Sequence, residues 1–175
     1  GPAGGRKHRH VTPELEDLFT FLRFPSVSTD SRHAGDVRAC AGWLIGKLSA
    51  MGLSTELHET PKHHVVIARN AHVPGRRTVL IYGHYDVQPV DPVSLWDTDP
   101  FKPVVRELEP GRKIISARGA CDDKGQVMTF IEAVRATLAE TGDLPIGLTI
   151  LVEGEEESGS VNLPGYIKAN AAELK

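Results

Sequence analysis

The chain of 175 residues is long enough to form a domain with a substantial hydrophobic core, and its composition is that of an ordinary globular protein. A formal net charge of −3 and the lack of a long apolar run argue against nucleic-acid binding, a membrane-surface patch or a membrane span. Only Cys40 and Cys121 are present, without a CxxC pair, and no signal peptide is recognisable, so we expect a cytoplasmic protein without a disulfide framework.

Glycine and arginine dominate the start of the chain, which predicts a flexible leader over residues 1–11, followed by one domain over residues 12–175. Apolar spacing and turn residues define the elements of this domain. In chain order we expect a helix over 12–25, a helix over 36–51, strands over 54–58, 65–70 and 78–82, a hairpin over 104–116, a helix over 126–140, a strand over 146–152 and a helix over 162–174.

Strands that alternate with helices in this way indicate an α/β domain, a layered sheet flanked by helices. The strand Thr78–Tyr82 is continuously apolar, which is typical of a strand covered on both faces of a sheet. For the last helix the spacing predicts that Ile167, Ala171 and Leu174 face inward.

Residue types that bind metals follow three of the apolar elements. His84 and Asp86 come after the strand at 78–82, Asp122-Asp123 lies between glycines after the hairpin, and an acidic run over 153–157 follows the last strand. Because loops at the ends of sheet strands converge on one crevice, we expect these groups to meet. Imidazole and carboxylate ligands suit zinc, manganese or cobalt, and a carboxylate can bridge two such ions.

Each motif has a simpler interpretation when it is taken alone. His84 can be a surface histidine, and Asp122-Asp123 can be acids that favour the start of a helix. The residues Glu155–Glu157 can be a solvated run of charge. A nucleophilic role for Cys121 beside His84 is disfavoured, because the neighbouring carboxylates oppose the thiolate form.

Four longer segments follow one another in a fixed order along the chain. They are Gly83-His84-Tyr85-Asp86-Val87-Gln88-Pro89, Trp96-Asp97-Thr98-Asp99-Pro100-Phe101, Arg118-Gly119-Ala120-Cys121-Asp122-Asp123-Lys124-Gly125 and Glu153-Gly154-Glu155-Glu156-Glu157-Ser158-Gly159-Ser160. Together they resemble a known family of dinuclear metallopeptidases, which includes carnosine and other dipeptidases, succinyl-diaminopimelate desuccinylase, acetylornithine deacetylase, aminoacylase and glutamate carboxypeptidase. The sequences of the segments are most similar to the carnosine-dipeptidase-like branch, and the similarity extends from about Thr12 to the chain end.

This resemblance implies two divalent metal ions, zinc in the first place, with manganese or cobalt as alternatives. His84 would bind one ion, with Asp86 orienting its ring. Asp122 would bridge the two ions, and a cis peptide bond is expected between it and Asp123. Glu157 would bind the second ion.

The implied catalytic base is Glu156, which would take a proton from a metal-activated water and return it to the leaving amine. The substrate would be a small peptide or, in the desuccinylase and deacetylase alternative, an N-acyl amino acid. Glu153 and Glu155 receive no chemical role, and Glu155 is expected to be solvated.

The family members are much longer than this chain. They supply a further acidic ligand, a histidine ligand near their C-terminus, and a lid domain through which full-length members often form homodimers. We therefore expect the N-terminal part of a zinc-peptidase-like catalytic domain, incomplete and without the lid domain, in which each ion has two of its three protein ligands. An alternative of another class is an inactive structural or interaction module.

Overall fold

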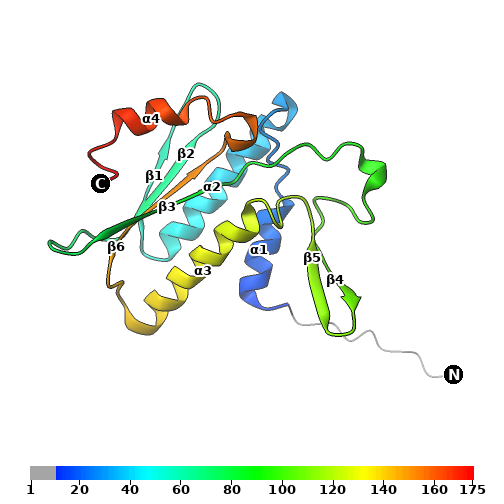
Figure 1. Cartoon of the computed structure of the whole chain (residues 1–175), viewed down its shortest axis with the longest axis horizontal. Helices are drawn as coiled ribbons and strands as arrows, with labels where there is room; N and C mark the ends of the chain where they lie inside the picture. Colours follow the sequence, from blue (N-terminus) through cyan, green and yellow to red (C-terminus); the bar gives the residue numbers. More distant parts are fainter. Residues whose placement is uncertain (1–10) are drawn as a thin grey trace.

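A computed structural model describes residues 11–175. Residues 1–10 of the predicted leader lie outside the described residues. Short 3-10 helices occur at Ser31–His33, Val93–Leu95 and Glu156–Ser158. The helices and strands (Figure 1) are, in chain order, α1 (Pro13–Arg23), α2 (Ala34–Ala50), β1 (Ser54–His58), β2 (Val65–Arg69), β3 (Thr78–His84), β4 (Val104–Glu109), β5 (Arg112–Ser116), α3 (Lys124–Thr141), β6 (Gly147–Glu153) and α4 (Leu163–Ala169).

Four strands form the central sheet, in the order β1-β2-β6-β3, while β4 and β5 form a separate hairpin. β2 runs antiparallel to both of its neighbours, and β3 runs parallel to β6. The parallel register pairs His84 with Glu153, the last residues of their strands. Both strands therefore deliver their following loops to the same edge of the sheet.

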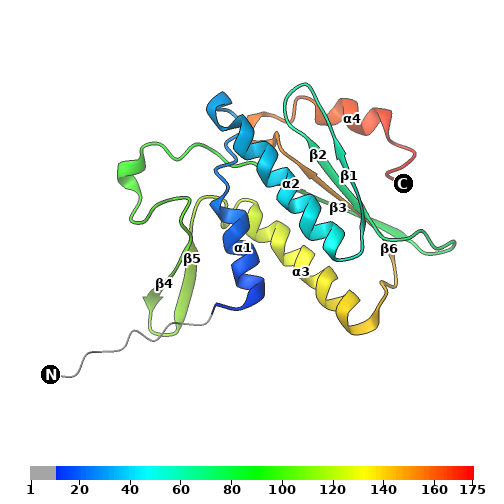
Figure 2. The same ribbon diagram turned by 180° about the vertical axis from the view of Figure 1, so that it is seen from behind.

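Helices cover both faces of this sheet, which confirms the predicted layered α/β architecture (Figures 1 and 2). The larger core joins α1, α2 and α3 to alternate residues of β2 and β6, including Val66, Ile150 and Val152. On the opposite face, Leu163 and Tyr166 of α4 pack against a smaller cluster of Val65, Ile67 and Leu151.

The prediction that Thr78–Tyr82 is covered on both faces was wrong. Within residues 11–175, β3 pairs only with β6 and forms an edge of the sheet, where Val79, Leu80 and Tyr82 are 42%, 47% and 49% exposed. A continuous apolar run indicates a strand, but it does not by itself distinguish an edge strand from a central one. The strand also extends to His84, so this residue belongs to β3 rather than to the following loop.

The last helix is shorter than predicted, because it ends at Ala169 instead of continuing to Leu174. Ile167 is 42% exposed and Ala171 is also exposed, so the predicted inward face was wrong for these two residues. Leu174 does contact the smaller core, but from the turn after the helix. None of the helices in residues 11–175 combines the length and the apolar character that a membrane crossing requires.

Candidate metal centre

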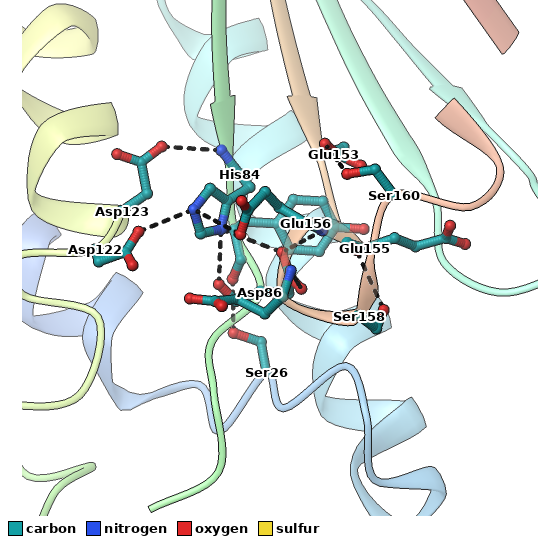
Figure 3. A network of polar contacts seen from close by, with 12 residues as sticks. Ser26, His84, Asp86, Asp122, Asp123, Glu153, Glu155, Glu156, Ser158 and Ser160 are labelled. Atoms are coloured by element: carbon teal, nitrogen blue, oxygen red, sulfur yellow. Dashed lines mark hydrogen bonds and ion pairs between the residues drawn. The ribbon is translucent and has the colours of Figure 1, made fainter. Parts of the chain in front are cut away.

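Three loops meet at the carboxyl ends of β3 and β6 (Figure 3). His84 ends β3, the acidic segment 153–160 follows β6, and Asp122-Asp123 directly precedes α3. Gly83 allows α3 to lie close to this strand end, because a Cβ at this position would come within 2.7 Å of the Val127 side chain. The predicted convergence of the three motifs is confirmed.

His84 lies at the centre of the cluster, with only 6% of its side chain exposed. Its Nε2 atom is 3.0 Å from an Asp122 oxygen and 3.6 Å from a Glu156 oxygen. Asp123 accepts a hydrogen bond from the backbone N–H of His84 at 3.1 Å. The peptide bond between Asp122 and Asp123 is cis, as the resemblance implied.

Asp86 is completely buried and connects His84 to the acidic segment. Its carboxylate lies 3.2 Å from His84 Nδ1, and its carbonyl oxygen is 3.0 Å from the same atom. The two carboxylate oxygens also accept hydrogen bonds from the backbone N–H groups of Glu156 (3.2 Å) and Glu157 (2.9 Å). Asp86 thus directs Nε2 of His84 toward Asp122 and fixes the backbone of the Glu156-Glu157 pair.

Ligand atoms of His84, Glu156 and Glu157 lie within 4.8 Å of one another, a spacing that fits a divalent ion. Asp122 is not in this group of three, although its carboxylate contacts the same imidazole nitrogen. The side chains of Asp122 and Glu156 are 68% and 42% exposed, so the cluster opens to solvent. An imidazole nitrogen surrounded by carboxylate oxygens is a donor set suited to zinc, manganese or cobalt.

The charges in this cluster favour a bound cation. Burial lowers the pKa of His84, but the hydrogen bonds and negative charge of Asp86 outweigh it and raise the pKa to about 9. Partial burial raises the pKa of Glu157, the hydrogen bond from Gln88 lowers it, and the negative charges of Asp122 and Glu156 add to the increase. Among residues 11–175, no lysine or arginine forms an ion pair with Asp122, Glu156 or Glu157.

Glu155 is not solvated, so that expectation was wrong. The residue is 3% exposed, and its side chain points away from His84 (Figure 3). Its carboxylate accepts hydrogen bonds from the His63 N–H at 2.9 Å and from the Asn162 side chain at 2.9 and 3.1 Å. Burial alone raises the pKa of Glu155, but the hydrogen bonds from His63, Asn162 and Thr60 outweigh it, so the pKa lies below its usual value.

Three further hydrogen bonds support the site and were not predicted from the sequence. Gln88 donates a hydrogen bond to a Glu157 oxygen at 2.9 Å. Buried Glu153 accepts hydrogen bonds from the hydroxyls of Tyr82 and Ser160. These bonds connect the start of the acidic segment to β3 and to the end of the segment. The only sequence signal for Gln88 is its place in the His84–Pro89 segment, and none identifies Tyr82.

A histidine and several carboxylates at the ends of parallel strands define an α/β domain with a candidate metal centre. The sequence profile of "Peptidase family M20/M25/M40" matches residues 80–174. This segment contains every residue of the cluster described above. The chain belongs to this peptidase family.

Three proteins that this chain resembles are named as dipeptidases or as a carboxypeptidase. The "Cys-Gly metallodipeptidase DUG1" of Saccharomyces cerevisiae is 42% identical over 86% of this chain and 33% of its own length. The "M20 family metallo-carboxypeptidase Sso-CP2" of Sulfolobus solfataricus has a TM-score of 0.81 at 38% identity, over 94% of this chain and 36% of its own. Human carnosine dipeptidase 1 has a TM-score of 0.83 at 28% identity, over 92% of this chain and 36% of its own. This chain therefore spans about a third of the length of the relatives it matches.

Proposed function

We propose that residues 12–175 form the N-terminal part of the catalytic domain of a metal-dependent peptide hydrolase that acts on dipeptides. The observation that carries the proposal is the position of His84, whose Nδ1 is held by Asp86 while its Nε2 faces Asp122 and Glu156. The relatives named as dipeptidases support the choice of substrate. The cytoplasmic location and the homodimer stay predictions.

The proposed centre would hold two divalent ions, zinc in the first place. His84 and Asp122 would bind one, and Asp122 and Glu157 the other. Bound ions of this kind lower the pKa of a coordinated water and polarise the carbonyl of the scissile bond. Glu156 stands beside His84 Nε2 at 3.6 Å and is exposed enough to take the proton from such a water and give it to the leaving amine.

Hydrolysis by the 175-residue chain tests this function. The chain is incubated with zinc, manganese or cobalt and with a panel of dipeptides, beside N-succinyl and N-acetyl amino acids, and the released amines are quantified. An active chain would release amines from dipeptides only when a metal ion is added. Release from the N-acyl amino acids alone would favour the desuccinylase or deacetylase alternative, and metal binding without any turnover would favour the inactive module.

Alanine substitutions at the proposed ligands should differ in how much metal they remove. A bridging carboxylate serves both ions, so Asp122→Ala is expected to abolish binding of both. Glu157→Ala is expected to remove one ion and leave the other. Calorimetric titration with zinc measures both stoichiometries, and equal losses in the two variants would contradict the bridging role of Asp122.

A further inference from the structure

Lys124, the first residue of α3, is completely buried and follows directly after Asp122 and Asp123. Its amine donates hydrogen bonds to the backbone oxygens of Phe21 and Phe24, both at 2.9 Å, and lies 5.2 Å from the centre of the Phe21 ring. Within residues 11–175, it forms no ion pair with a carboxylate. Burial of an unpaired ammonium group costs several kcal/mol, so a purely structural position would favour an apolar side chain.

The acceptors of Lys124 lie at the end of α1. Carbonyl groups in the last turn of a helix have no partner within the helix and carry the negative end of its dipole. A lysine amine satisfies these oxygens well. Lys124 therefore fastens the start of α3 to the end of α1, across about a hundred residues of sequence.

The segment that follows α1 holds the loop that begins directly after His84. The Ser26 hydroxyl donates a hydrogen bond to the Tyr85 carbonyl at 2.7 Å, and the Val87 N–H donates one to the Ser26 carbonyl at 2.9 Å. Val27 forms an isolated parallel bridge with Val87. The backbone on both sides of Asp86 is thus bonded to a segment whose start is bonded to Lys124.

Gly119, in the loop that carries Asp122, lies against the Lys124 side chain. A Cβ on Gly119 would come within 2.9 Å of the Val87 side chain and 3.3 Å of the Lys124 Cδ, so this glycine leaves room for both side chains. The N–H of Gly125 donates to the Gly119 carbonyl at 3.3 Å and closes the loop. Movement of Lys124 would therefore move Asp122 as well.

We propose that Lys124 is a positioning residue for the His84–Asp122 pair. It ties the Asp122 loop to the segment after α1, and that segment holds the loop that follows His84. In this way the backbone segments that carry the two proposed ligands are held by contacts that lie outside the metal centre. The metal-binding consequence rests on the proposed function, whereas the connection between the two loops does not.

The test compares Lys124→Met with Lys47→Met. The methionine keeps the length of the stem but removes the donors to Phe21 and Phe24. Lys47 is a matched control: its side chain is 11% exposed, and it pairs with Asp17 at 2.6 Å and Glu132 at 2.8 Å, away from the ligand loops. Hydrogen exchange is measured for residues 84–87 and 119–127 at the same interval below each variant's melting temperature, and cobalt affinity is measured by calorimetry.

We expect Lys124→Met to accelerate exchange in both loops and to weaken cobalt binding by about 10- to 100-fold, the range found for residues that support metal ligands. Lys47→Met should lower the melting temperature without either change. Protection of both loops at the wild-type level in Lys124→Met would overturn the proposal. If the wild-type chain binds no cobalt, the proposed function fails, but the exchange rates still test whether Lys124 holds the two loops. The two failures can therefore be told apart.

If Lys124→Met does not fold, Ser26→Ala provides the second test. It removes one hydrogen bond, to the Tyr85 carbonyl, and leaves the backbone contact with Val87. We expect faster exchange at residues 84–87 in this variant. Exchange at the wild-type rate would show that the Ser26 hydroxyl does not restrain the loop that follows His84 and would overturn the proposal.

Discussion

Glu156→Gln is expected to abolish metal-dependent peptide hydrolysis while the metal content of the protein stays unchanged. The glutamine amide has the shape of the carboxylate but cannot accept a proton from a bound water. Loss of a general base typically lowers the rate by about 10²- to 10⁴-fold. Initial rates on a dipeptide and elemental analysis of the same samples measure the two quantities together.

The position of Glu156 fits either a metal ligand or a general base, and this variant distinguishes the two roles. Its oxygen lies 3.6 Å from His84 Nε2, within the group of three residues that could bind an ion. A variant that loses both activity and metal would identify Glu156 as a ligand and would contradict the assignment as a base. Glu140→Gln makes the same chemical change on the exposed surface of α3 and should alter neither quantity.

The sequence predicted the convergence of the site because its motifs are local. His84 and the acidic run follow apolar strands directly, and neighbouring parallel strands bring their following loops to one edge. Asp122-Asp123 could be added through the order of the motifs and the family resemblance. The metal roles of these residues rest on the family resemblance and stay predictions.

Burial was harder to predict than location, because it depends on partners far away in the chain. The run Glu153–Glu157 reads as uniformly charged, but Glu153 and Glu155 are buried while Glu156 is exposed. The hydrogen-bond donors to Glu155 come from residues 60–63 and from Asn162. The sequence of neither segment indicates that it donates to this carboxylate. The exposure of β3 depends on strand order, which local periodicity does not encode.

The burial of Lys124 was equally hard to predict from the sequence. A lysine at the start of a helix is expected to be exposed, since long charged side chains are almost never fully buried unless they are paired. Its partners are backbone oxygens of α1, which have no sequence signature at all. Contacts between a side chain and distant backbone therefore become visible only in the folded structure.

Glu155→Ala is expected to lower the free energy of unfolding by about 1–3 kcal/mol, the cost of leaving buried hydrogen-bond donors without an acceptor. The substitution leaves the buried His63 N–H and the partly buried Asn162 amide without their acceptor. For a chain of this size the loss corresponds to a fall in melting temperature of roughly 5 °C. Urea unfolding and thermal melts of the metal-free protein measure it.

The stabilisation from Glu155 should depend on pH in a defined direction. Hydrogen bonds hold its pKa in the folded protein below the usual value, so the folded state favours the ionised form. Its contribution is fully present above the pKa of the unfolded chain, about 4.3 for a glutamate, and is lost as the pH falls through the lower folded pKa. We expect the stability difference between the wild type and Glu155→Gln to be largest near neutral pH and to shrink in acid.

Comparison with Glu140→Gln separates this effect from the general acid sensitivity of the protein. Both variants remove one carboxylate, but Glu140 is exposed and accepts no hydrogen bond among the described residues. Its replacement should leave the unfolding free energy nearly unchanged at every pH. A wild type whose stability rises relative to Glu155→Gln as the pH falls would show that Glu155 is protonated in the folded protein near neutral pH. In that case the hydrogen bonds from His63 and Asn162 would be made to a neutral acid, and the connection between β2 and the acidic segment would not depend on charge.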